Sequence, residues 1–113
     1  MSDCLFCKIA NKEIPSEKIY EDDVVFAFKD IDPKAPFHGL VIPKMHFPSV
    51  KEMDEERAKI VGHMVMVGSR IAADQGLDNG FRMVINTGED GGQTVDHCHL
   101  HILGGRSLQW PPG

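Results

Sequence analysis

The sequence predicts an α+β fold: an antiparallel sheet of about five strands with one long helix and a short N-terminal helix. Three observations predict this fold. Residues 54–75 repeat apolar side chains at helical spacing, between a capping aspartate and a glycine. Short apolar or alternating segments, which are typical of strands, lie on both sides of that helix. The last of these segments, residues 97–103, alternates three histidines with apolar residues.

Length and composition limit the class of protein. With 113 residues, 42% of them hydrophobic and 26% charged, the chain is expected to form a single domain, residues 1–113. A net charge of −5 argues against a nucleic-acid partner, which binds a basic surface. The apolar runs are too short for a membrane span, and the first residues do not resemble a secretory signal. We therefore expect a cytoplasmic protein with no membrane or nucleic-acid partner.

The first predicted element is a short helix or turn at residues 4–10, which carries a C-x-x-C pair, Cys4 and Cys7. Such a pair is typical of a redox motif, half of a zinc site or two buried thiols. A redox motif is expected beside a βαβ pattern, and none follows here. Zinc needs two further ligands, and His46 and His97 are available. Zinc is the favoured interpretation, and free structural thiols are the alternative.

The five predicted strands have recognisable ends. They lie at residues 19–21, 24–29, 38–43, 81–86 and 97–103. Asp22 and Asp23 favour a turn that joins the first two strands into a hairpin. Pro43 ends the third strand, and Asn79-Gly80 is a strong turn signal before the fourth.

The long predicted helix begins after Asp54 and ends before Gly76. Its apolar stripe comprises Ile60, Val61, Met64, Val65, Val67, Gly68, Ile71 and Ala72. The methionines at positions 53, 64 and 66 are expected to pack in the core or at an interface. His63 has no supporting set of reactive residues, so we expect it to be structural or solvated.

The histidine-rich strand is the centre of the functional hypothesis. One of its faces would carry His97, His99 and His101, and the other would carry Cys98, Leu100 and Ile102. Because histidine is a poor strand former, three in phase favour a catalytic or metal site over a solvent-exposed face. A glycine-rich loop, residues 87–94, precedes the strand, and its amides and hydroxyl can hold an anion.

The segment from Gln93 to Arg106 resembles the signature of the histidine-triad (HIT) family, His-x-His-x-His with apolar x. Residues 26–31 and 38–46, Asn86 and the tail Trp110-Pro111-Pro112-Gly113 are also similar to that family. The resemblance covers nearly the whole chain and is greatest to the nucleotide-binding branch, whose members are nucleoside phosphoramidases. It implies the HIT-like fold and a homodimer in which Trp110 reaches the active site of the partner.

The resemblance also implies site residues. The purine would lie among Leu5, Phe6, Ile9, Phe28 and Ile31, the ribose hydroxyls on Asp30, and the phosphate near Asn86, Gly92, Gln93, Thr94, His99 and His101. His38 would orient the triad. Cys4, Cys7, His46 and His97 would bind one structural zinc per chain, as in some bacterial members. We predict His99 as the nucleophile, because a neutral imidazole can attack phosphorus and leave again, and His101 as a phosphate donor that shares in proton transfer.

These residues predict hydrolysis of purine nucleoside 5′-phosphoramidates, of the adenosine 5′-monophosphoramidate type, to AMP or GMP through a nucleotidyl-histidine intermediate. One alternative is hydrolysis of dinucleoside polyphosphates, a related activity that the Trp-Pro-Pro-Gly tail disfavours. The other is a non-catalytic protein that binds nucleotides or a partner protein.

Overall fold

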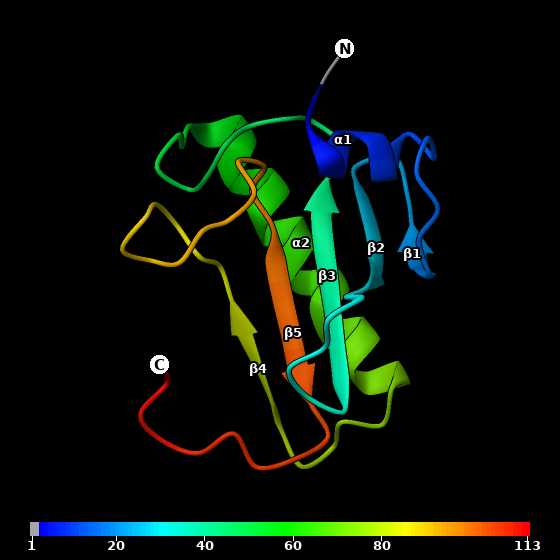
Figure 1. Ribbon diagram of the computed structural model, residues 1–113, viewed down its shortest axis with the longest axis vertical. Coiled ribbons are helices and arrows are strands. Elements are labelled where there is room, and N and C mark those ends of the chain that lie inside the picture. The colour runs from blue at the N-terminus through cyan, green and yellow to red at the C-terminus, as the bar shows by residue number, and fades with distance from the viewer. Residues whose placement is uncertain (1–2) are drawn as a thin grey trace.

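The computed structural model describes residues 3–113 and contains a five-stranded antiparallel sheet between two helices (Figure 1). The elements are α1 (Leu5–Ala10), β1 (Lys18–Glu21), β2 (Val25–Lys29), β3 (Phe37–Pro43), α2 (Glu55–Asp74), β4 (Phe81–Val84) and β5 (Leu100–Gly104). The strand order is β1-β2-β3-β5-β4. The predicted α+β architecture is confirmed. In the described part of the chain, neither helix is long and apolar enough to cross a membrane.

The ends of α2 follow the predicted signals. The Asp54 carboxylate accepts the backbone N–H of Arg57 at 2.8 Å, which satisfies one of the free amides of the first turn. At the other end Gly76 has a φ of +73°, a left-handed conformation that few other residues adopt without strain. The Asp22 carboxylate accepts the N–H groups of Val24 and Val25, both at 2.8 Å, and so closes the β1–β2 turn.

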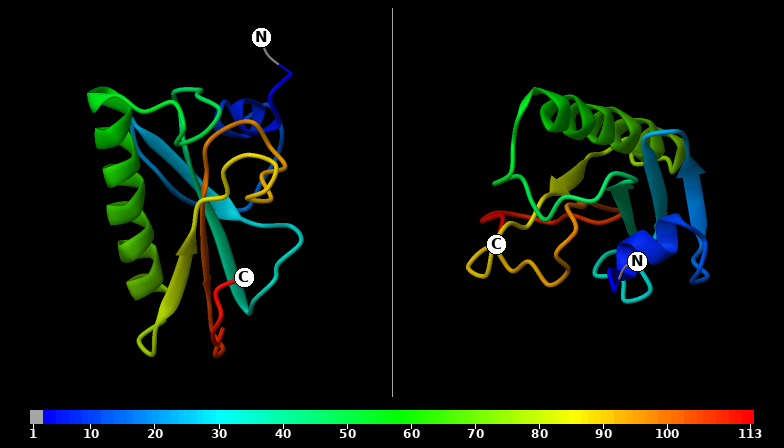
Figure 2. Two further views of the ribbon diagram at one scale, coloured as in Figure 1. Left: turned by 90° about the vertical axis from the view of Figure 1, so that its left-hand side faces the viewer. Right: turned by 90° about the horizontal axis from the view of Figure 1, so that it is seen from above.

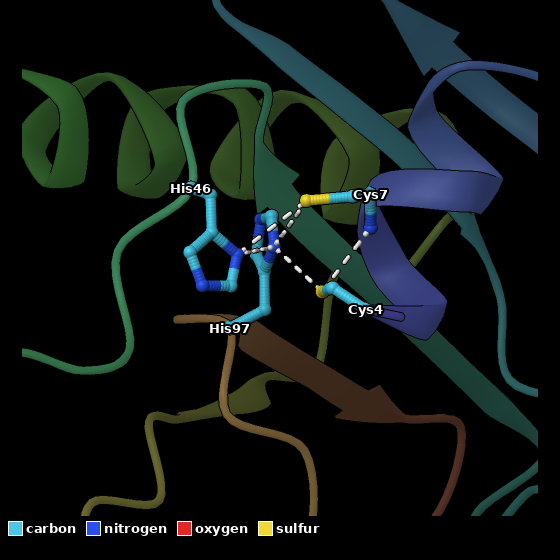
Figure 3. Close-up of side chains that lie close together, drawn as sticks. All are labelled: Cys4, Cys7, His46 and His97. Atoms are coloured by element: carbon cyan, nitrogen blue, oxygen red, sulfur yellow. Dashed lines mark hydrogen bonds between the residues drawn. The ribbon is translucent and has the colours of Figure 1, made fainter. Parts of the chain in front are cut away.

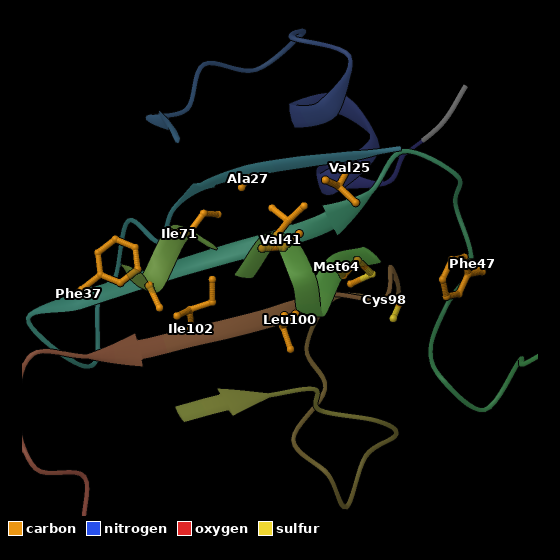
Figure 4. Close-up of a cluster of buried hydrophobic side chains, with 12 residues drawn as sticks. Val25, Ala27, Phe37, Val41, Phe47, Met64, Ile71, Cys98, Leu100 and Ile102 are labelled. Atoms are coloured by element: carbon orange, nitrogen blue, oxygen red, sulfur yellow. The ribbon is translucent and has the colours of Figure 1, made fainter. Parts of the chain in front are cut away.

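The two faces of the sheet are covered differently (Figure 2). Helix α2 covers one face, where it buries the larger hydrophobic core (Figure 4). Helix α1 lies on the other face, over a smaller cluster formed by Phe6, Ile9, Ala10, Phe26, Phe28, Leu40 and Ile42. Because α1 covers only part of its face, residues of β2, β3 and β5 beside it remain accessible to a ligand.

The strand that carries the histidines is shorter than predicted. Strand β5 begins at Leu100, so the prediction that it begins at His97 is wrong. The N–H of Cys98 donates to the carbonyl of Phe47 at 2.8 Å, so it is bonded to the β3–α2 loop and not to a neighbouring strand. The chain therefore joins the sheet only after this residue. The alternation of side chains persists, since Cys98 and Leu100 are buried in the α2 core while His99 lies on the other side.

The apolar stripe of α2 is also narrower than predicted. Met64, Val67, Gly68, Ile71 and Ala72 are buried. Val65, Met53 and Met66 are each 41% exposed, so they lie outside the core of the chain; for the two methionines this leaves the second predicted alternative, an interface. A helix that packs on one sheet buries one stripe, and positions 65 and 66 lie outside it.

Candidate functional site

A cavity of about 290 Å³ opens on the sheet face that α1 partly covers. Its walls come from α1, the segment before β1, strands β2, β3 and β5, and the loops beside them. They are formed by Leu5, Phe6, Ile9, Ile14, Pro15, Ser16, Phe28, Asp30, Ile31, Leu40, Thr94, Val95, His99 and His101. The lining is mainly apolar, with a few polar groups that include two histidines, as is typical of a small-molecule site.

The cavity gathers most of the residues predicted for a nucleotide. These are Leu5, Phe6, Ile9, Phe28, Asp30, Ile31, Thr94, His99 and His101. Phe28 is both core and cavity wall, because it is only 4% exposed and still lines the opening. Sequence reasoning missed Ile14, Pro15, Ser16, Leu40 and Val95. Of these, only Leu40 carried a usable signal, since it alternates with His38 on the strand that pairs with Phe28.

Asn86, Gly92 and Gln93 do not line the cavity. The side-chain amide of Gln93 donates to the carbonyls of Pro48 and Val95, at 2.6 and 2.9 Å, and its oxygen accepts the N–H of Gly88. The amide of Asn86 donates to the carbonyl of Gly91 at 2.6 Å. In this structure the two amides therefore hold the shape of the glycine-rich loop that ends at Thr94.

The ring of His99 is held by one hydrogen bond that fixes its protonation pattern. Its Nδ1 lies 2.7 Å from the carbonyl oxygen of His97. A carbonyl can only accept, so Nδ1 carries the proton and Nε2 keeps a lone pair for the cavity. The ring is 4% exposed and contacts Phe6 edge-on, with the ring centroids 5.0 Å apart. Burial lowers the pKa of His99, which keeps the imidazole neutral.

His101 is positioned by His38, which lies one hydrogen bond behind the cavity. The N–H of Lys34 donates to His38 Nδ1 at 3.0 Å, so the proton of His38 is on Nε2. His38 Nε2 in turn donates to His101 Nδ1 at 2.9 Å. His101 therefore carries its proton on Nε2 and presents a donor to the cavity. Burial, together with the nearby His99 and His38, lowers the pKa of His101 to about 4.

A second cluster lies beside α1 and brings together the four predicted metal ligands (Figure 3). His97 Nδ1 lies 3.3 Å from Cys4 Sγ and 3.6 Å from Cys7 Sγ, while His46 Nδ1 lies 3.4 Å from Cys7 Sγ and 3.0 Å from His97 Nδ1. In a tetrahedral zinc site, bonds of about 2.0–2.3 Å separate neighbouring ligand atoms by about 3.3–3.7 Å. The donor set and its spacing fit zinc.

The protonation of His97 also fits a metal ligand. Its Nε2 lies 2.8 Å from the carbonyl of Pro43, so Nε2 carries the proton and Nδ1 faces the two sulfurs with a lone pair. Burial lowers the pKa of His97 to about 4, and a neutral ring is the form that binds metal. Asp30, His38 and His101 are also close enough to share an ion. The proton on His38 Nε2 argues against a metal there.

Comparisons with known proteins agree with this geometry. Residues 3–109 match a family model described as "Scavenger mRNA decapping enzyme C-term binding". An uncharacterized HIT-like protein of Synechococcus elongatus is 51% identical over 111 residues, which cover 98% of this chain and 97% of the relative. The chain belongs to the histidine-triad family.

Solved HIT structures superpose closely on the fold. A HIT family hydrolase from Legionella pneumophila has a TM-score of 0.95 at 43% identity, over 98% of this chain and 100% of that one. A histidine triad protein from Clostridium difficile has a TM-score of 0.94 at 50% identity, over 98% and 97% of the two chains. The whole described HIT chain thus shares its architecture with these relatives.

Proposed function

We propose that this HIT protein hydrolyses the phosphorus–nitrogen bond of purine nucleoside 5′-phosphoramidates. The observation that carries the proposal is the pair of ring nitrogens in the cavity. His99 keeps a lone pair on Nε2, and its ring centroid lies 5.0 Å from that of His101, whose Nε2 is a donor. A nucleophile and an anion donor side by side are what attack on a phosphate derivative requires.

The reaction would proceed in two displacements. His99 Nε2 attacks phosphorus in line, and the bond to the leaving nitrogen breaks as the new phosphorus–Nε2 bond forms. His101 donates to a phosphate oxygen and shares in proton transfer to the departing amine. Water then attacks phosphorus and the phosphorus–Nε2 bond breaks, which restores neutral His99 and releases AMP or GMP. The proton that water loses replaces the one that His101 passed toward the amine. The carbonyl of His97 stabilises the positive charge that the His99 ring carries in the intermediate, because Nδ1–H points at it.

The rest of the cavity supports a purine ribonucleotide. Leu5, Phe6, Ile9, Phe28 and Ile31 offer apolar area to the base, and a purine buries more area than a pyrimidine. The side chain of Ile31 is 96% exposed, so burying it against a bound base would remove an unusually exposed apolar group from water. Asp30 can accept hydrogen bonds from ribose hydroxyls.

Zinc would have a structural role in this proposal. Cys4 and Cys7 come from α1 and its cap, His46 from the loop after β3, and His97 from the segment before β5. A bound ion would tie these segments together and so hold the wall of the cavity. We also propose a homodimer, which is supported by exposed apolar side chains on α2, at the sheet edge and in the tail: Val65, Met66, Phe81 and Trp110.

The experiment that tests the function compares purified protein on two substrates, an adenosine 5′-phosphoramidate and a diadenosine polyphosphate. We expect turnover of the phosphoramidate, with AMP as product, and much slower turnover of the polyphosphate. Faster turnover of the polyphosphate would show that the protein is a dinucleoside polyphosphate hydrolase. Tight AMP binding without turnover of either substrate would make the chain a nucleotide-binding protein. The neighbour described as a HIT family hydrolase favours turnover over binding alone, and the two substrates separate the two hydrolase activities.

A further inference from the structure

Ser16 is a polar residue of the cavity to which the proposed mechanism gives no role. It precedes β1 and lines the cavity with Ile14 and Pro15. The residue is half-buried. Among residues 3–113 its hydroxyl has no hydrogen-bond partner, so one donor and two acceptor sites are available to a ligand.

Extending the register of the sheet beyond the end of β1 places Ser16 opposite Asp30. Lys18 pairs with Phe28 in the antiparallel β1–β2 ladder. The pairing continues beyond the end of β1, because the N–H of Lys29 donates to the carbonyl of Glu17 at 2.9 Å. One more step puts residue 16 beside residue 30. Directly opposed side chains point to the same face, with Cβ atoms about 4.5–5.5 Å apart, and both residues do line the same cavity.

The carboxylate of Asp30 is partly occupied already. Its Oδ1 accepts the N–H of Asp32 at 2.8 Å, and its Oδ2 lies 3.4 Å from His38 Nε2. An ionised carboxylate can only accept, so it takes the hydrogens of a diol but gives nothing to the diol oxygens. A ribose has two neighbouring hydroxyls, each of which is both donor and acceptor. Asp30 alone therefore leaves part of the hydrogen-bonding capacity of the diol unused.

We propose that Ser16 is a second ribose-recognition residue, whose O–H donates to an oxygen of the cis-diol while Asp30 accepts from its hydrogens. This inference rests on the proposed function, since it requires a nucleotide in the cavity. The two residues would contact the sugar from the segments that flank β1 and β2. The pair favours ribonucleotides over deoxyribonucleotides more strongly than a lone carboxylate does.

The test measures dissociation constants by titration calorimetry for AMP, 2′-deoxy-AMP and 3′-deoxy-AMP. The proteins are the wild type, Ser16→Ala and the control Ser69→Ala, which removes a hydroxyl on the exposed side of α2. Ser16→Ala should bind AMP about fivefold more weakly, the value of one hydrogen bond. It should lose nothing with the deoxynucleotide that lacks the hydroxyl in contact. Ser69→Ala should bind all three nucleotides as the wild type does.

Two results would overturn the inference while leaving the proposed function intact. One is wild-type affinity of Ser16→Ala for AMP. The other is an equal loss for AMP and both deoxynucleotides, which would assign Ser16 to the base or to the fold. A wild-type protein that does not bind AMP would overturn the proposed function and the inference with it. Thermal melting checks the fold, and an unchanged melting temperature is expected because Ser16 makes no side-chain hydrogen bond in the described chain.

Discussion

His97 and His99 are two residues apart, yet their rings are prepared for different chemistry. His97 donates from Nε2 to the carbonyl of Pro43 and turns Nδ1 to two cysteine sulfurs. His99 donates from Nδ1 to the carbonyl of His97 and keeps Nε2 for the cavity. In both rings a hydrogen bond to a backbone carbonyl fixes which nitrogen is protonated. The other nitrogen keeps a lone pair, which faces the cysteine sulfurs in His97 and the cavity in His99. The chemistry open to each histidine therefore depends on which of its ring nitrogens is bonded to a backbone carbonyl.

The two clusters also differ in how the fold supports them. Three separate segments meet at the Cys4–Cys7–His46–His97 cluster, so an ion there would stabilise their arrangement. His38 and His101 of the second cluster have support from the ladder itself, since Leu40 pairs with His101 and His38 with Leu103 across β3 and β5. We therefore expect losses in the first cluster to act mainly on stability, and losses in the second mainly on chemistry.

The largest expected effect is on turnover when the nucleophile is removed. His99→Ala should lower the turnover of an adenosine phosphoramidate by roughly 10³-fold or more, as loss of an attacking group does in other enzymes. AMP affinity should change little, because the apolar walls and Asp30 remain. Steady-state kinetics and calorimetry measure the two quantities. The control is His63→Gln, which removes a histidine bonded to Asp22 on the other side of the sheet and should keep wild-type turnover. Turnover of His99→Ala near the wild-type rate would contradict the assignment of His99 as the nucleophile.

The next effect is on stability when the metal cluster is broken. Cys7→Ser should lose zinc and several kcal/mol of unfolding free energy, because the binding energy of a structural metal is folding energy. Elemental analysis and thermal melting measure this. Cys98→Ala, which removes a buried thiol outside the cluster, should keep one zinc per chain. If chelation leaves the melting temperature of the wild type unchanged, zinc has no structural role here.

A smaller effect concerns the support of His101 by His38. His38→Ala leaves His101 Nδ1 without its donor and should lower turnover by about 10²-fold, the lower end of what a group that takes part in proton transfer contributes. His101→Ala should lower it by a similar factor. Because the first residue acts through the second, the double variant should be little worse than either single variant. Effects that multiply in the double variant would show that His38 acts independently.

The smallest effect is on the pH profile. Burial lowers the pKa of His38 and lowers that of His101 to about 4, from an ordinary value of 6.5. A lowered pKa means that the neutral rings persist as the pH falls, so kcat/KM should stay nearly constant from neutral pH to well below 6.5. The measurement is kcat/KM against pH with a saturated metal site. A fall centred near 6.5 would mean that the working histidines titrate like free ones.

Features specified by neighbours in sequence could be predicted. The Asp54 cap, the end of α2 at Gly76 and the alternation of histidines with core residues all depend on adjacent positions, and the structure has them. The four possible zinc ligands could be chosen because their number and softness suit the ion, and they do lie together.

The remaining features depend on contacts between distant segments. The start of β5 is decided by the bond from Cys98 to the carbonyl of Phe47, which no local pattern shows. The hydrogen bonds from the Gln93 amide to the carbonyls of Pro48 and Val95 likewise depend on how the loops pack together. The position of Ser16 in the cavity could not be predicted for a similar reason, since it depends on the β1–β2 register that leads toward Asp30. The protonated nitrogens of His97 and His99 likewise become known only when their carbonyl partners are placed.

The most direct test of the account is the stereochemical course of hydrolysis at phosphorus. The substrate is an adenosine phosphoramidate whose phosphorus is made chiral by one sulfur atom and an oxygen isotope. The wild-type protein hydrolyses it, and the configuration at phosphorus in the product is determined. Attack by His99 followed by attack by water inverts phosphorus twice, so the account predicts retention. A quenched reaction should also yield an acid-labile adenylyl group on the peptide that contains His99. Inversion would contradict the covalent mechanism, because it requires direct attack by water and leaves the lone pair of His99 without a covalent role.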